Sequence, residues 1–144
     1  MRKRNKIRKL LKLPETPEEA FELANELYNN ALKTLSESPV ENGRYRNIKK
    51  VSEACGTAYL AVLRAIEGEM LRRGFSPDEF PENVIEYRKF LRSLPKNGKL
   101  IDAFNTVYEN LHLFGYYRHG ADEAMIKSGF EKAREIINKL TGKK

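Results

Sequence analysis

The sequence predicts an all-α protein, a bundle of four or five up-and-down helices preceded by a short basic arm. Three observations predict this class. Apolar residues recur with a period near 3.6 in five separate segments, which is the spacing of helices that bury one face. Proline and glycine residues interrupt the chain between these segments, and no stretch of useful length alternates apolar and polar residues as a strand does. The connections are mostly short, so neighbouring helices are expected to be antiparallel.

The length and the cysteine count limit the organisation of the chain. With 144 residues, one compact domain is expected over residues 14–144, after a basic arm at residues 1–13. A single cysteine cannot form an internal disulfide or a structural zinc site, so apolar packing must hold the domain together. No run of about 18 uncharged apolar residues is present, and the basic start lacks the apolar region of a secretory signal. A cytoplasmic protein without membrane contact is therefore expected.

The excess positive charge is confined to the arm. The formal net charge is +7, and the first 12 residues hold seven Lys and Arg residues and no acid. The remaining 20 basic residues are balanced by 20 acidic ones, so the basic pI does not describe the surface of the domain. Ile7, Leu10 and Leu11 have the spacing of a short amphipathic helix. The arm is expected either to pack on the bundle, to stay solvated, or to contact anionic groups, with the phosphates of nucleic acid favoured over anionic lipid. Its candidate nucleic-acid contacts are Arg2, Lys3, Arg4 and Lys6.

The first helix of the bundle is expected to begin at Thr16. Thr16 is the predicted N-cap, Pro17 occupies the first helical position, and Glu19 is the predicted capping-box partner. Apolar residues then repeat on one face as far as Leu35. This helix is therefore expected to bury one face only.

The longest periodic segment, residues 45–73, is expected to be the central helix. It follows a loop around Gly43, and Gly74 stops it. Small residues, Gly56 among them, would let neighbouring helices approach closely. Cys55 lies on the apolar face with no basic residue one turn away, which predicts an inert thiol in the core.

Three shorter helices complete the predicted bundle. Ser76 followed by Pro77 indicates a short capped turn after the central helix. Pro95 closes the next helix, and Gly142 ends the last one. The apolar periods place these helices over residues 84–94, 100–111 and 124–140.

The densest group of chemically versatile residues is the segment 112–120, which contains both histidines and is expected between the fourth and fifth helices. Gly115 and Gly120 would free the backbone there, so that polar side chains could converge on a ligand. The opposing interpretation is that the glycines permit a helix end and a turn, that a tyrosine covers the core edge, and that Arg118 pairs with an acid. The candidate ligand-binding residues are Tyr116, Tyr117, Arg118 and His119, and the candidate catalytic residues are His112, Arg118 and His119.

Neither a metal site nor a cofactor site is predicted. If the fourth helix continued to His119, that residue would lie about 10.5 Å along the axis from His112, too far for one ion. No further histidine or cysteine completes a ligand set, and no serine occupies the strand-turn-helix elbow of a hydrolase.

A second group of cations lies at the start of the expected central helix, in residues 44–50. Phosphates could bind there with help from the first N–H groups of the helix, and cations at this end oppose the helix dipole, which favours a functional role. The nearby acids Glu37, Glu41 and Glu53 favour a solvated, partly paired face instead. The candidate nucleic-acid contacts here are Arg44, Arg46, Lys49 and Lys50.

Three parts of the sequence resemble a known group of helical domains. They are residues 54–63, which read ACGTAYLAVL, residues 111–117, which read LHLFGYY, and a last helix with Ala133 and Ile137. Over residues 16–141 this pattern resembles the HEPN-type helical bundles, and more closely a bacterial branch described only as a domain of unknown function. The resemblance implies a homodimer. It also implies one of two roles, because many HEPN members are toxin or defence ribonucleases and others are non-catalytic binding modules.

The ribonuclease motif of that group is absent from this sequence. Catalytic members carry an arginine followed after four to six residues by a histidine, and neither His112 nor His119 has an arginine at that distance before it. The sequence therefore favours a non-catalytic interaction or ligand-binding module that forms a homodimer or binds another protein. The alternative is a divergent metal-independent ribonuclease, or an RNA-binding protein, of a defence or toxin–antitoxin type. In the ribonuclease, His112 or His119 would supply the base and Arg118 the stabilising cation.

Overall fold

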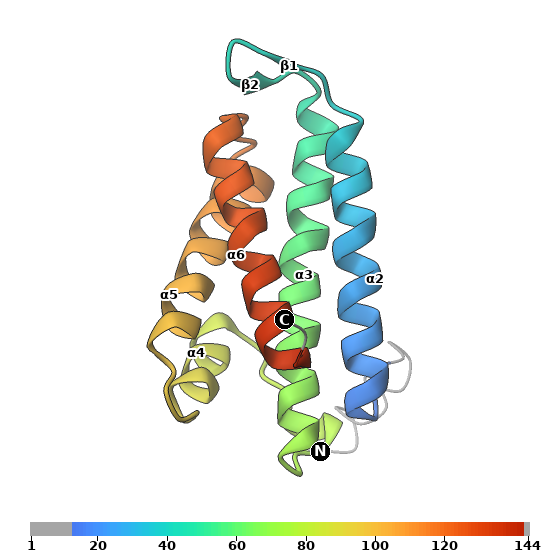
Figure 1. The fold of residues 1–144 in the computed structure, drawn as a ribbon, viewed down its shortest axis with the longest axis vertical. Helices are drawn as coiled ribbons and strands as arrows, with labels where there is room; N and C mark the ends of the chain where they lie inside the picture. The colour runs from blue at the N-terminus through green and yellow to red at the C-terminus, as the bar shows by residue number, and fades with distance from the viewer. Residues whose placement is uncertain (1–12, 143–144) are drawn as a thin grey trace.

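The computed structural model describes residues 13–142 and confirms the all-α class (Figure 1). The elements in chain order are α2 (Pro17–Ser36), β1 (Val40–Glu41), β2 (Arg44–Tyr45), α3 (Ile48–Arg72), the 3₁₀ turn Pro77–Glu79, α4 (Val84–Arg92), α5 (Gly98–Val107), the π-helix η2 (Tyr108–Tyr117) and α6 (Glu123–Thr141). The arm predicted over residues 1–13, with Arg2, Lys3, Arg4 and Lys6, lies outside the described residues except for Leu13.

Helix α2 begins where the sequence predicts. The Thr16 hydroxyl accepts a hydrogen bond of 3.1 Å from the Glu19 N–H, and Pro17 lies in the first turn, so the predicted N-cap is confirmed. The Glu19 carboxylate accepts a bond of 3.0 Å from the N–H of Glu15 instead of that of Thr16. The second hydrogen bond of the predicted capping box, which should join Glu19 to the backbone of Thr16, is therefore made to the residue before the cap.

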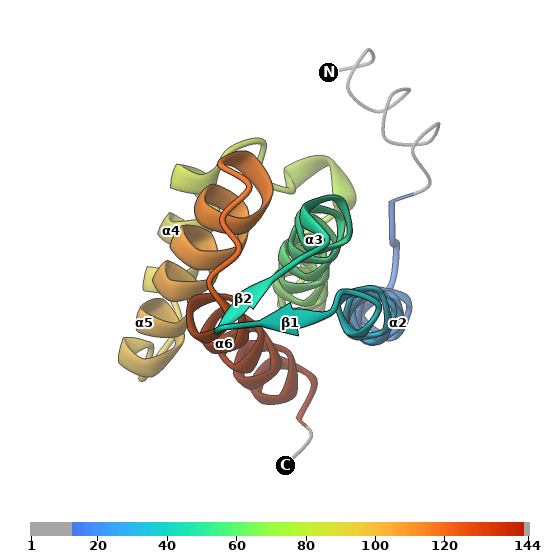
Figure 2. The ribbon, with the colours of Figure 1, turned by 90° about the horizontal axis from the view of Figure 1, so that it is seen from above.

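A small β-hairpin stands where the sequence predicts a loop. Val40 pairs with Tyr45 across it, and the turn residues Asn42 and Gly43 have φ angles of 54° and 73°. Both angles lie in the left-handed region that the tightest hairpin turns require and that Asn and Gly adopt at least cost. Seen from above, the hairpin lies across one end of the bundle (Figure 2).

The predicted start of the central helix at Tyr45 is wrong. The side chain of Asn47 caps α3 by accepting a bond of 3.2 Å from the Lys50 N–H, and the helix begins at Ile48. Tyr45 is instead buried in β2, where its N–H donates to the Ala121 carbonyl at 2.9 Å. Its apolar side chain matches the helical spacing, but the main-chain bond to a distant segment determines its conformation.

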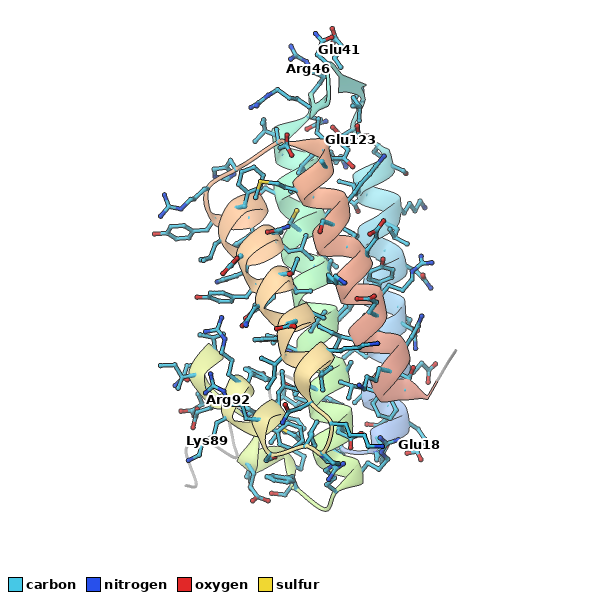
Figure 3. The ribbon with its side chains drawn as sticks, turned by 60° about the vertical axis from the view of Figure 1, so that its left-hand side comes forward. Glu18, Glu41, Arg46, Lys89, Arg92 and Glu123 are labelled. Carbon is cyan, nitrogen blue, oxygen red and sulfur yellow. The ribbon has the colours of Figure 1, made fainter. Side chains whose placement is uncertain are left out.

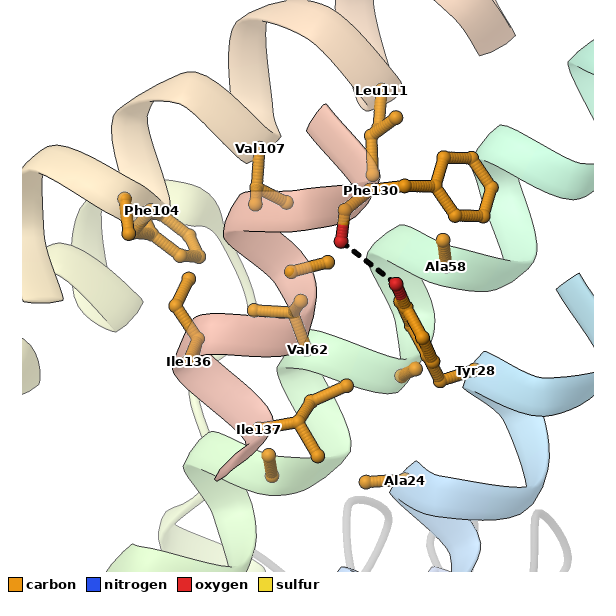
Figure 4. Close-up of a cluster of buried hydrophobic side chains, with 14 of the residues drawn as sticks. Ala24, Tyr28, Ala58, Val62, Phe104, Val107, Leu111, Phe130, Ile136 and Ile137 are labelled. Atoms are coloured by element: carbon orange, nitrogen blue, oxygen red, sulfur yellow. Dashed lines mark hydrogen bonds between the residues drawn. The ribbon is translucent and has the colours of Figure 1, made fainter. Parts of the chain in front are cut away.

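Helix α3 is the centre of the bundle and packs against α2, α6 and η2 (Figure 1). The helices α2 and α3 come so close that the ring of Phe21 lies where a side chain at Gly68 would stand. In the interior, the Tyr28 hydroxyl donates a hydrogen bond of 2.9 Å to the Phe130 carbonyl of α6 (Figure 4). The apolar side chains buried around this bond include Val62, Phe104, Val107, Leu111, Ile136 and Ile137.

The last helices follow the prediction with shifted ends. Helix α4 ends at Arg92, two positions before the expected Leu94. Helix α6 begins after the N-cap Asp122, whose carboxylate accepts from the Met125 N–H at 3.0 Å, and it is closed by the C-cap Gly142, where φ is 79°. None of the described helices is both long and apolar enough to cross a membrane.

Candidate functional site

The fourth predicted helix continues past its expected end. After α5 the chain adopts the wider turns of a π-helix over residues 108–117, and Gly115 lies within it. The expectation that residues 112–120 form a break between two helices is therefore wrong. A Cβ atom on Gly115 would stand 2.9 Å from the Cβ of Cys55 and 3.1 Å from the side chain of Ile126. This glycine lets η2 pack closely on α3 and does not interrupt the helix.

Four rings on α3 and η2 form a row that we call the aromatic strip, and they belong to Tyr59, Tyr108, His112 and Tyr116. The His112 ring stacks on Tyr59, with the ring centroids 4.6 Å apart and the planes inclined by 27°. Tyr116 is nearly parallel to His112, at 13° and 6.1 Å, and Tyr108 lies 5.3 Å from His112 on the other side. Three of the rings lie in one line because residues four apart on a helix are neighbours.

Arg88 of α4 closes the α4 end of the strip. Its guanidinium carbon lies 4.8 Å from the ring centroid of Tyr108 and 5.9 Å from that of Phe104. Its Nε donates to the Asn105 side-chain oxygen at 3.2 Å, which fixes the direction of the guanidinium group. Arg88 therefore places a cation over an aromatic face, an arrangement that stabilises both groups.

Tyr116 and Tyr117 lie at the surface, at the end of the strip opposite Arg88. The Tyr116 ring covers Gly56 of α3 so closely that a Cβ there would be 2.8 Å away, and its side chain is still 48% exposed. Its carbonyl accepts a hydrogen bond of 3.2 Å from the Ser52 hydroxyl. Tyr117 is 69% exposed. One tyrosine therefore covers the core edge while the other projects into solvent.

Arg118 and His119 follow as exposed residues at the end of the π-helix. The Arg118 N–H donates to the Leu113 carbonyl at 2.9 Å, and the Gly120 N–H donates to the Phe114 carbonyl at 2.7 Å. His119 lies between these bonds with φ at 57°, in the left-handed region. The four predicted ligand-binding residues therefore form one continuous exposed edge that backbone bonds hold in place.

His112 does not contact the other two predicted catalytic residues. Among the described residues, no hydrogen bond, ion pair or ring contact joins it to Arg118 or His119, and its ring faces pack on Tyr59 and Tyr116. Burial lowers the pKa of His112 from its ordinary value, so the imidazole is neutral at pH 7. Cleavage of RNA without a metal needs a base and a cation at one phosphate. The structure does not bring His112 to Arg118 as such a pair, whereas His119 lies next to Arg118 on the exposed edge.

The second predicted cluster lies at the same end of the bundle as the exposed edge (Figure 3). Arg46 pairs with Glu41 at 3.5 Å, and Lys50 pairs with Glu37 at 3.2 Å. The two cations of the cluster that form no ion pair with a described residue are Arg44 and Lys49, both exposed. Half of this cluster is therefore already neutralised, and Arg44 and Lys49 leave positive charge at the end of the bundle that carries the exposed edge.

Outside the strip and the exposed edge, the described residues form neither a metal site nor a reactive thiol. No three His, Cys, Asp or Glu side chains within residues 13–142 are placed to hold one metal ion. Cys55 is buried in the core as predicted, and burial raises the pKa of its thiol to about 12. A thiol with so high a pKa is almost entirely protonated at neutral pH and is a poor nucleophile.

Two members of the strip, both half-buried, are not recognisable from the sequence as part of it. The periodicity places Tyr59 and Tyr108 on apolar helix faces, where core packing is the ordinary role. The spacing of Tyr108, His112 and Tyr116 is a signal for the strip, but it is visible only if the helix continues through Gly115. Arg88 has no sequence signal at all, because its position over Tyr108 depends on how α4 packs.

Comparisons with known proteins identify relatives without an assigned role. A family model described as "Domain of unknown function (DUF5618)" matches residues 19–142. A solved protein of unknown function from Dyadobacter fermentans is similar, with 31% sequence identity and a TM-score of 0.73. The match covers 87% of this chain and 96% of that one. No curated protein matches the sequence at a significant level.

Proposed function

We propose that this chain, which belongs to the family described as "Domain of unknown function (DUF5618)", is a non-catalytic interaction module that binds a protein partner through the aromatic strip. The observation that carries the proposal is the stacking of His112 between Tyr59 and Tyr116, because it commits the imidazole to packing and leaves a row of half-buried rings that ends at the exposed Tyr116. Tyrosine and arginine are enriched at the energetic centres of protein interfaces. The strip supplies tyrosines, Arg88 lies at one end of it, and the exposed Tyr117 follows Tyr116 at the other.

A second copy of the chain is the partner that we infer first. In a two-fold interface the same patch meets itself, so the patch must present complementary groups. The exposed acids Glu53 and Glu109 lie on the two helices that carry the strip, and the exposed cations Lys49 and Arg118 lie on or directly after the same helices. The surroundings of the strip therefore carry both signs of charge, which supports self-association.

The resemblance to HEPN-type bundles supports the same proposal. Many members of that group are ribonucleases that act as dimers, and others are non-catalytic binding modules. The all-α architecture and the close packing of η2 on α3 are compatible with a HEPN-like assignment, which stays part of the proposal.

The oligomeric state of the full chain tests this proposal. Sedimentation equilibrium over a range of concentrations should show a reversible dimer, and Tyr116→Ala combined with Tyr117→Ala should weaken it at least about tenfold. Met125→Ala is the matched control, because Met125 is an exposed apolar residue on α6, a helix that contributes no ring to the strip. A monomer at all concentrations, or a dimer that is insensitive to the tyrosine changes, would contradict the homodimer.

RNA binding, with or without cleavage by a divergent ribonuclease, is the second candidate. The observation that favours it is the exposed rings of Tyr116 and Tyr117 beside cations without ion pairs, since bases stack on rings and phosphates bind cations. The full chain should be incubated with end-labelled single-stranded RNA and EDTA at low and physiological salt. Cleavage that disappears in His119→Ala would support the nuclease, and a salt-sensitive gel shift without cleavage would support binding. Intact, unshifted RNA would favour the protein partner.

Two broader statements belong to the same proposal. A cytoplasmic location is supported by the single cysteine, Cys55, because the fold contains no disulfide that would need an oxidising compartment. We also propose that residues 1–13 are an arm separate from a domain at residues 14–144. Limited proteolysis should then trim the chain close to residue 13 and leave the domain intact.

A further inference from the structure

Helices α5 and α6 form the walls of a groove in the part of the bundle near the start of α5. Its cavity volume is about 660 Å³, within the range of small-molecule sites. The floor consists of Leu100, Ala103 and Ile136, which are all buried apolar residues. The groove therefore has an apolar floor and a volume that suits a small ligand.

Lysines from both walls stand at the rim of this groove. Helices α5 and α6 run antiparallel (Figure 1), so Lys99 in the first turn of α5 and Lys139 in the last turn of α6 flank the same end. Neither forms an ion pair with a described residue. The third lysine, Lys132, is already paired with Glu135 at 3.0 Å. The exposed Asp102 completes the charged rim, which keeps a net positive charge.

The groove on the other side of α6 serves as an internal comparison. It lies between α2 and α6, has a volume of about 550 Å³ and includes Tyr28 and Phe130. Its two cations are engaged, because Arg134 lies 5.4 Å over the Tyr28 ring and Lys127 pairs with Glu123 at 2.8 Å. Of these two grooves, the one between α5 and α6 is therefore the one that combines an apolar floor with lysines on both walls that form no ion pair with a described residue.

We propose that the groove between α5 and α6 binds an amphiphilic anion, with an apolar chain on its floor and one anionic group between Lys99 and Lys139. A charged group prefers the water-exposed end that the two lysines flank, while the chain gains by leaving water. This site is independent of the aromatic strip, which lies on α3 and η2.

Decanoate is a suitable probe, since it joins an apolar chain to one carboxylate. The full chain, labelled with ¹⁵N, should be titrated with decanoate and, separately, with uncharged decanol, and followed by amide chemical shifts. The amides of residues 99–106 and 132–139 should shift with decanoate, and decanol should bind clearly more weakly. The double variant Lys99→Glu with Lys139→Glu should weaken decanoate binding about tenfold, because it reverses two attractive charge contacts.

Matched variants separate binding from folding. Lys33→Glu with Lys89→Glu makes the same change of charge on α2 and α4 and should leave the affinity unchanged. Ala103→Leu places a larger side chain on the floor and should reduce binding, with circular dichroism confirming that the variant folds. The proposal is overturned if decanol binds as well as decanoate, if the charge-reversed variant keeps its affinity, or if the shifts centre on Tyr28 and Phe130.

Discussion

The hydroxyl of Tyr87 donates a hydrogen bond of 2.7 Å to the carboxylate of Glu67, and both side chains are buried. Arg64 donates to the other oxygen of that carboxylate at 2.5 Å, so the buried charge is satisfied on both oxygens. Burial and the neighbouring Glu67 raise the pKa of Tyr87 well above its ordinary value, which keeps the phenol protonated and able to donate. This bond joins α4 to the central helix α3.

Replacing Tyr87 by Phe should lower the free energy of unfolding by about 1–3 kcal/mol, because one oxygen of the buried Glu67 carboxylate loses its donor. Urea unfolding followed by circular dichroism measures the change. Tyr117→Phe is the control, since that side chain is exposed and the same loss of a hydroxyl should cost less than about 0.5 kcal/mol. Equal costs at the two positions would show that the buried bond is not a source of stability.

A methyl group at Gly115 should destabilise the protein by about 1–3 kcal/mol, because it would overpack the contact between η2 and Cys55. The expected result is a lower urea midpoint with an unchanged slope. Gly98→Ala is the matched control, since a Cβ there meets no neighbouring atom within 4 Å. Combining Gly115→Ala with Cys55→Ala should recover part of the loss, and a fully additive double variant would argue against the steric explanation.

The thiol of Cys55 should resist alkylation while the protein is folded. Burial blocks access and raises the thiol pKa to about 12, so the reactive thiolate is scarce. Mass spectrometry after incubation with iodoacetamide should show unmodified protein in buffer and complete modification in concentrated urea. Rapid labelling in buffer would indicate that η2 opens away from α3 far more often than the packing implies.

Stability should fall as the pH drops below neutrality, and His112 should contribute to that fall. Burial lowers the pKa of His112 in the folded state, so the unfolded chain takes up its proton first, near pH 6.5. The folded state therefore loses stability as the pH falls through that value towards the folded pKa. His112→Phe keeps a ring in the stack without the titration, and its unfolding free energy should vary less between about pH 7.5 and pH 5. His119→Phe, at an exposed position, should retain the dependence of the natural protein.

The helices could be predicted from the sequence because their signals are local. Thr16 is an N-cap with a proline directly after it, and the apolar spacing of the long segments leaves few alternatives. The hairpin was within reach of the same reasoning, since Asn42 followed by Gly43 is a strong signal for a two-residue turn. Its strands are only two residues long, too short to show an alternating pattern.

The candidate site could be predicted only in part. The exposed positions of Tyr117 and Arg118 agree with the composition of their segment, but the π-helix does not follow from it. In the sequence, Gly115 is typical of a helix break. In the structure its role is to let α3 pack closely against η2, and this contact between distant segments cannot be read from the local sequence. The strip joins α3 to η2, and Arg88 comes from α4, so Tyr59 could be placed beside His112, and Arg88 over Tyr108, only after the chain had folded.

The hairpin at the end of the bundle also affects the order in which the protein folds. The Tyr45 N–H donates to the Ala121 carbonyl, and the Glu123 N–H donates to the Gly43 carbonyl, each at 2.9 Å. These bonds connect the turn between the first two long helices to the turn before the last one, across most of the chain. A long stretch of chain separates the two partners of each bond, so these bonds are slow to close. They should form after the local helical contacts and join the two halves of the bundle last. Because main-chain atoms make both bonds, the side chains at this end of the bundle can change without breaking the connection.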